Sequence, residues 1–92
     1  MARYDSNPND AATCALDALS FILNDPLRAG RFIDTTGLTV DNLRGRLEDP
    51  STLAAILVFL EAHEPDLLAC AESIGRSPAS LVAAARTLEQ AA

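Results

Sequence analysis

Apolar residues recur at steps of three and four along most of the chain, which is the period of amphipathic helices. Helix-start signals divide this pattern, because a polar or acidic residue followed by proline or an apolar run recurs along it. Gly37 and Gly75 follow the second and fifth stretches, where a left-handed cap would end a helix. The expected helices cover about residues 8–24, 26–36, 40–47, 50–62, 65–74 and 78–88.

The apolar positions of each stretch define the face that we expect to be buried. The fourth stretch also carries Val58 and Phe59 outside its stripe, so this helix is apolar on most of its circumference and is expected at the centre of a bundle. The predicted inward positions are Ala12, Ala15, Leu16, Leu19, Ile22, Leu23, Leu27, Phe32, Ile33, Val40, Leu43, Leu47, Leu53, Ile56, Leu57, Leu60, Leu67, Leu68, Ala71, Ile74, Leu81, Val82, Ala85 and Leu88.

The pattern indicates one three-helix unit present twice, about 38 residues apart, because residues 18–22 align with residues 56–60. Further aligned pairs are Gly37 with Gly75, Thr39 with Ser77 and Leu43 with Leu81. Gly30 and Gly45 have no glycine counterpart, and simple reuse of caps could mimic a duplication. The pattern predicts one all-helical domain over residues 1–92, a compact bundle of about six short helices. Its pseudo-repeats, about 10–48 and 49–88, would share one core, and residues 1–7 would be flexible.

The composition agrees with a helical domain that needs no metal or disulfide to fold. The chain has 92 residues, and its 49% apolar fraction is dominated by Ala and Leu. Its longest uncharged apolar-rich run, residues 51–60, is half the length of a membrane span, so we expect a cytoplasmic protein with no membrane contact. Cys14 and Cys70 have no ligand-like spacing and are expected to be reduced, buried residues.

Several short motifs resemble a small bacterial family known as domain of unknown function 3572. They are Arg31-Phe32-Ile33, Thr36-Gly37-Leu38, Leu43-Arg44, Phe59-Leu60, Glu64-Pro65 and Ala84-Ala85-Arg86. The resemblance spans roughly residues 12–88 and rests mainly on cap and core positions. It implies a short, all-helical bacterial protein, and it brings no activity, cofactor or catalytic residue.

The sequence contains no pattern typical of a catalytic or metal site. His63 is the only histidine, and at the end of the fourth helix it is expected to bond free carbonyl groups and favour the helix dipole. The alternative, metal or acid–base chemistry, would need nearby carboxylates or a cleft that brings His63 beside Cys14 or Cys70. We therefore expect a protein that is not an enzyme and that holds no cofactor or metal.

The chain has a formal net charge of −6, but one segment is rich in arginine and positively charged. Residues 26–47 contain four arginines and two aspartates, a net charge of +2, so the rest of the chain carries −8. Arg28, Arg31, Arg44 and Arg46 are the candidate partner-binding residues, because the arginine fork binds carboxylates bidentately. The leading hypothesis is a non-enzymatic interaction domain that binds an acidic protein surface.

Two alternatives to this hypothesis remain open. The same arginines could simply form a solvated face of the domain. The spacing around Gly37 also resembles a helix-turn-helix, so the second alternative is nucleic-acid binding, which the acidic net charge opposes. Both a monomer and a homodimer are compatible with the sequence.

Overall fold

The computed structural model describes residues 8–92. The segment expected to be flexible, residues 1–7, lies outside the described residues, as does Asn7, the polar residue before Pro8 that would cap the first expected helix. In the described part of the chain there are six helices and no strand, which confirms the all-α prediction. The helices are α1 (Pro8–Leu23), α2 (Pro26–Thr36), α3 (Val40–Arg44), α4 (Pro50–Glu61), α5 (Glu64–Ile74) and α6 (Pro78–Ala91). None of the described helices combines the length and hydropathy needed to cross a bilayer.

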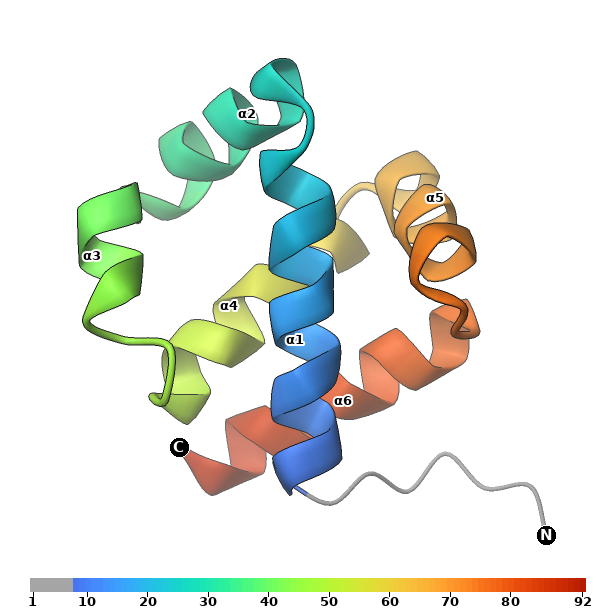
Figure 1. The fold of residues 1–92 in the computed structure, drawn as a ribbon. Coiled ribbons are helices and arrows are strands. Elements are labelled where there is room, and N and C mark those ends of the chain that lie inside the picture. Colours follow the sequence, from blue (N-terminus) through green and yellow to red (C-terminus); the bar gives the residue numbers. More distant parts are fainter. Residues whose placement is uncertain (1–7) are drawn as a thin grey trace, which may run out of the picture.

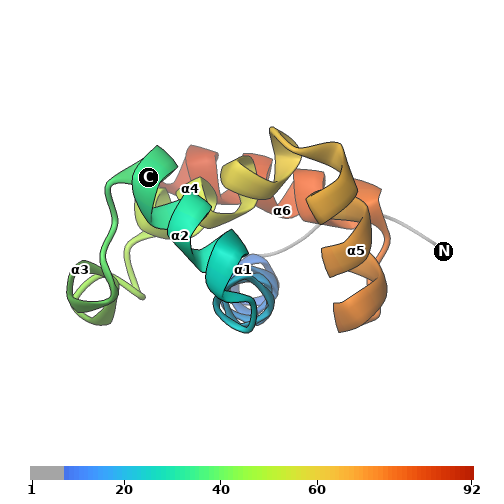
Figure 2. The same ribbon diagram turned by 90° about the horizontal axis from the view of Figure 1, so that it is seen from above.

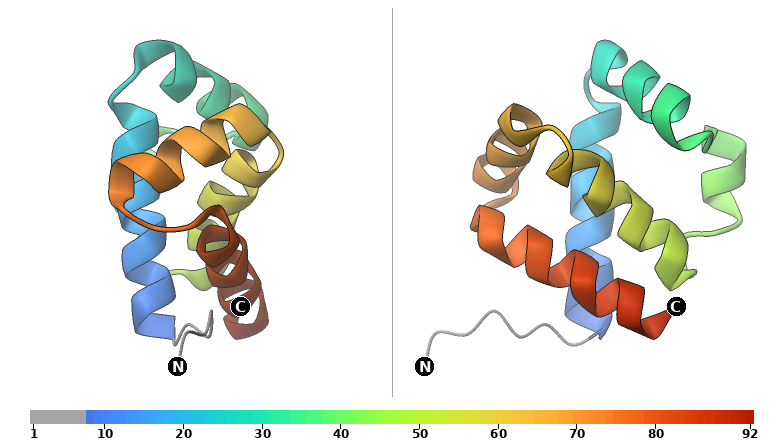
Figure 3. Two further views of the ribbon diagram at one scale, coloured as in Figure 1. Left: turned by 90° about the vertical axis from the view of Figure 1, so that its right-hand side faces the viewer. Right: turned by 180° about the vertical axis from the view of Figure 1, so that it is seen from behind.

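The centre of the molecule is formed by α1, α4 and α6 (Figure 1). Helices α4 and α6 pack along one another, and α1 crosses both, as the rear view in Figure 3 shows. Seen from above, α4 and α6 form a layer behind α1, with α3 and α5 at opposite ends (Figure 2). Helix α2 packs on α1 and α4, where Phe32 meets Phe59 edge to face at a ring-centroid distance of 5.2 Å.

Local hydrogen bonds start the helices where the sequence predicts. Asp25 and Asp49 accept bonds from backbone amides in the first turns of α2 and α4. Thr39 forms a reciprocal capping box with Asn42, and Ser77 caps α6. Helix α3 ends at Arg44, earlier than predicted, whereas α6 continues to Ala91.

The helix ends at Gly37 and Gly75 also agree with prediction. Their φ angles are 73° and 72°, the left-handed region that an L side chain rarely adopts. The amide of Gly37 donates to the carbonyl of Ile33, and that of Gly75 to carbonyls in the last turn of α5. Glycine therefore closes both helices for the conformational reason expected from the sequence.

The core confirms the central place of α4, which buries seven of its residues. Several predicted inward positions are wrong, because five of these side chains are exposed: Leu16, Leu23, Leu27, Val40 and Leu68. On α1 the predicted Ala15, Leu19 and Ile22 are buried. The buried face also includes Ala11, Cys14 and Ala18, whose small side chains allow neighbouring helices to approach closely. Leu16 and Leu23 lie to one side of that contact.

The predicted pseudo-twofold repeat is not confirmed by the helix arrangement. In the alignment α3 corresponds to α6, yet α3 has five residues and α6 has fourteen. Helix α6 packs along both α1 and α4, whereas α3 stands at the edge without comparable packing. The two halves share one core but use their third helices differently.

Candidate interaction surface

The four candidate arginines fall into two pairs in the structure. Arg28 and Arg31 lie on α2 and reach the same carboxylate, that of Asp66 on α5. Arg44 ends α3, and Arg46 lies in the turn that follows it. The side chain of Arg44 is 78% exposed, and its Nη1 lies 3.9 Å from Oδ1 of Asp41, which is also exposed. The structure thus brings Arg28 and Arg31 together and separates them from the other pair.

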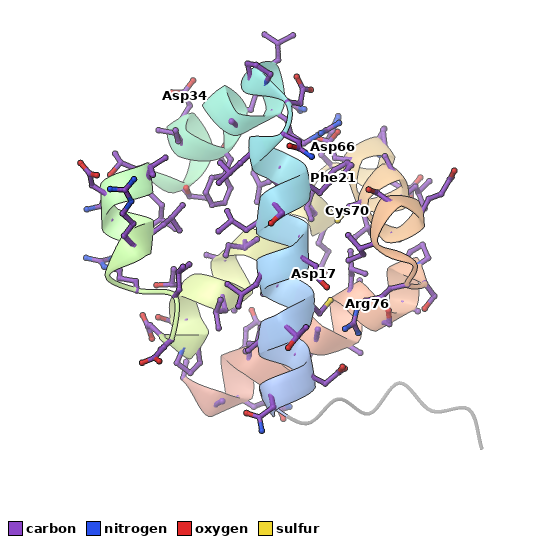
Figure 4. All side chains as sticks on the ribbon, viewed as in Figure 1. Asp17, Phe21, Asp34, Asp66, Cys70 and Arg76 are labelled. Carbon is purple, nitrogen blue, oxygen red and sulfur yellow. The ribbon has the colours of Figure 1, made fainter. Side chains whose placement is uncertain are left out.

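Asp66 is the centre of an ionic cluster that links three helices, and Figure 4 shows it near Phe21 between α1 and α5. The residue is 7% exposed, and it accepts bonds from Arg28 Nε at 3.4 Å and Arg31 Nη2 at 2.8 Å. Arg28 also donates to the carbonyl of Phe21 and lies over its ring, 4.0 Å from the centroid. Arg28 and Arg31 are therefore already bonded to groups within the fold.

The sequence alone did not identify Asp66 as the partner of these arginines. A weak signal existed, because Arg28 and Arg31 are three residues apart and so share one face of α2. The partner of that face, however, lies 38 residues along the chain from Arg28. No local pattern identifies a partner at that distance.

His63 does not cap α4 as predicted. It stands immediately before α5 in an extended conformation, and its side chain makes no cap hydrogen bond. Its Nε2 lies 3.9 Å from Asp66 Oδ2 instead. Ala62 takes the C-cap position of α4, and His63 takes the N-cap position of α5.

Both cysteines are free and fully buried, as predicted. Burial raises the pKa of Cys14, and it raises the pKa of Cys70 to about 11. Figure 4 places Cys70 between α1 and α5. Both thiols are therefore protonated at neutral pH and shielded from solvent.

A groove of about 440 Å³ lies beside Arg46. Its residues come from the end of α2, the turns on both sides of α3, and α4, which lie together on one side of the rear view (Figure 3). Its apolar lining residues are Leu38, Ala55, Val58, Phe59 and Ala62. Its volume is within the range of ligand sites, roughly 300–1,000 Å³.

Arg46 is the basic side chain of this groove. The nearby Asp49 accepts bonds from the hydroxyls of Ser51 at 2.8 Å and Thr52 at 3.0 Å, and these bonds lower the pKa of Asp49. Arg46 is attracted electrostatically by Asp49, but its guanidinium has no hydrogen bond or close ion pair with any described residue. Arg46 can therefore bind an added carboxylate without breaking a contact.

A second groove, of about 350 Å³, lies between the start of α1, the end of α6 and the turn before α4. Its lining includes Leu16, Leu47 and Leu53, and its one charged residue is Glu48. It therefore lacks the basic group that distinguishes the first groove.

A model of the protein family described as protein of unknown function, DUF3572, matches residues 8–91. The chain belongs to this family. The sequence resemblance is thus confirmed over nearly the whole chain. No curated protein and no solved structure matches the chain.

The structure gives this DUF3572 chain no extended recognition helix after Gly37. Helix α3, which would take that place, has five residues and is about 7 Å long. Residues 8–92 also hold no group of three or more His, Cys, Asp or Glu side chains placed to bind a metal ion. The groove beside Arg46 is therefore the arrangement on which we base the functional proposal.

Proposed function

We propose that this family member is a non-enzymatic interaction domain that binds an acidic protein surface through Arg44, Arg46 and the adjoining groove. The observation that carries the proposal is Arg46, a basic side chain at an apolar groove with no close ion pair among the described residues. Arginine is enriched at protein interfaces because its planar fork pairs with carboxylates. The protein would act in the cytoplasm, as a monomer or homodimer.

The other two candidates, Arg28 and Arg31, receive a different role in this proposal. Their guanidinium groups already bond Asp66, so a partner carboxylate would have to compete with a contact inside the fold. We therefore assign them to holding α2 against α5. The partner-binding set narrows from four arginines to the exposed pair around the end of α3.

An affinity pull-down from the lysate of the native cell tests the proposal. The wild type is compared with Arg44→Ala/Arg46→Ala and with Arg76→Ala/Arg86→Ala, whose arginines pair with Asp10 and Glu61 elsewhere on the molecule. We expect the wild type and the second variant to recover the same partner, and the first variant to recover about tenfold less. Equal recovery by all three proteins would exclude this surface.

Nucleic-acid binding is the alternative that the spacing around Gly37 suggests. Fluorescence anisotropy with duplex DNA and RNA at low salt, where phosphate binding is strongest, distinguishes the two functions. We expect no change in anisotropy. If the wild type binds duplex DNA or RNA and Arg44→Ala/Arg46→Ala does not, the partner of this surface is a nucleic acid and not a protein.

A further inference from the structure

We infer that the groove beside Arg46 binds an amphipathic helix of the partner, which lies along α4 and places a carboxylate at Arg46. The inference rests on the proposed function, because it names the kind of element that the partner presents. It is carried by the shape of the groove floor, the secondary structure around it and the charge at its end.

The floor of the groove has the spacing of a helix surface ridge. Ser51, Ala55 and Val58 of α4 and its C-cap residue Ala62 all line the groove, and they follow one another at steps of four, three and four. This row extends over about 16 Å, or three helical turns. Ala55 and Ala62 are small, and Val58 is 38% exposed, so a second helix could approach at the usual interaxial distance of roughly 8–10 Å.

A helix fits this surface better than an extended peptide does. An extended peptide satisfies its backbone groups by joining a sheet edge, and the described part of the chain contains no strand. A helix satisfies its own backbone hydrogen bonds and needs from the groove only apolar contact. The hydroxyls of Ser51 and Thr52 need no hydrogen bond from the partner helix, because both already donate to Asp49.

The charge at the groove favours an acidic partner helix. Arg46 and Asp49 both line the end of the groove where α4 begins. Asp49 already accepts bonds from the hydroxyls of Ser51 and Thr52, whereas Arg46 has no close ion pair among the described residues. A carboxylate on the apolar side of the partner helix would gain a charge-assisted bond there.

A synthetic alanine-based peptide of about 14 residues provides the probe, since shorter isolated helices are marginal. It carries leucines at steps of three and four and one glutamate on the same face. We expect it to shift the backbone amide NMR signals of Ala55, Val58 and Ala62. Its affinity, measured by fluorescence anisotropy, should fall about tenfold in Val58→Glu, which places a charge on the apolar floor.

A charge exchange tests the contact at Arg46. Arg46→Glu should bind the glutamate peptide at least about fivefold more weakly, and a lysine version of the peptide should recover that loss. Leu68→Glu is the matched control, because Leu68 is 49% exposed on α5 and lies outside the groove. Circular dichroism and thermal unfolding verify that each variant is folded.

The inference is overturned if the peptide does not bind at about 1 mM, if a scrambled peptide binds equally well, or if Val58→Glu leaves the affinity unchanged. These outcomes are separable from failure of the proposed function. A protein partner that requires Arg44 and Arg46, combined with no peptide binding, would retain the function and reject the helix. Peptide binding that depends on the groove, without a protein partner that requires Arg44 and Arg46, would retain the helix-binding groove and reject the proposed function.

Discussion

Asp66 shows how one side chain can hold several helices. It accepts bonds from Arg28 and Arg31 of α2, and Arg28 in turn bonds the carbonyl of Phe21 on α1. Asp66→Asn should lower the free energy of unfolding by about 2–3 kcal/mol, because it leaves the mostly buried Arg28 with only its longer pair to Asp25, at 3.8 Å. Urea unfolding followed by circular dichroism measures this change.

Two exposed carboxylates provide the controls for Asp66. Asp41→Asn removes the open pair with Arg44 and should cost less than about 0.5 kcal/mol. Glu64→Gln removes a charge from the same first turn of α5 and so measures the helix-dipole contribution alone. A cost for Asp66→Asn no larger than that for Glu64→Gln would show that the ionic cluster adds no stability.

The buried thiols give the fold a dependence on alkaline pH. Burial raises the pKa of Cys70 from 9.0 to about 11, so folding favours the protonated thiol. This contribution to stability is complete below pH 9 and is lost as the pH rises toward 11, because the unfolded thiol ionises first. We expect the free energy of unfolding to fall between pH 9 and 11 in urea titrations.

The double variant Cys14→Ala/Cys70→Ala is the test of that cause, since burial raises the pKa of both thiols. Its stability should decline less over the same pH range. An identical decline in the wild type and the variant would assign the effect to other groups.

At the scale of the helix, three glycines should respond to alanine in opposite directions. Gly37 and Gly75 close α2 and α5 at positive φ, so alanine there should destabilise the protein by about 1 kcal/mol. Gly30 lies inside α2 with nothing within 4 Å of an added Cβ, so alanine there should stabilise by about 0.5–1 kcal/mol. Thermal unfolding of the three single variants measures the signs, and a stabilising Gly75→Ala would contradict the cap assignment.

Across the whole molecule, the two halves depend on one another. Helix α6 packs along both α1 and α4, and the core is one cluster drawn from all six helices. Peptides covering residues 8–48 and 49–92 should each be unfolded alone, because a unit of about 40 residues buries too little surface. Circular dichroism and the dispersion of amide NMR signals test this expectation, with the full chain as the reference. A folded half would restore the hypothesis of two equivalent units.

Features of the fold were predicted correctly where the interacting residues are close together in the sequence. Asp25, Thr39, Asp49 and Ser77 form their cap bonds within two or three residues, so the sequence alone determines where α2, α3, α4 and α6 begin. The same holds for the glycine ends at Gly37 and Gly75. These features depend on side-chain chemistry next to the backbone groups that they satisfy.

Tertiary structure decided which of two adjoining apolar stripes on α1 is buried, because the answer depends on how closely its small residues let α4, α5 and α6 approach. It also decided that Arg28 and Arg31 meet Asp66 while Arg46 adjoins a groove built from three segments. Helical periodicity states which residues share a face of one helix. Only the rotation and packing of the helices determine what that face meets.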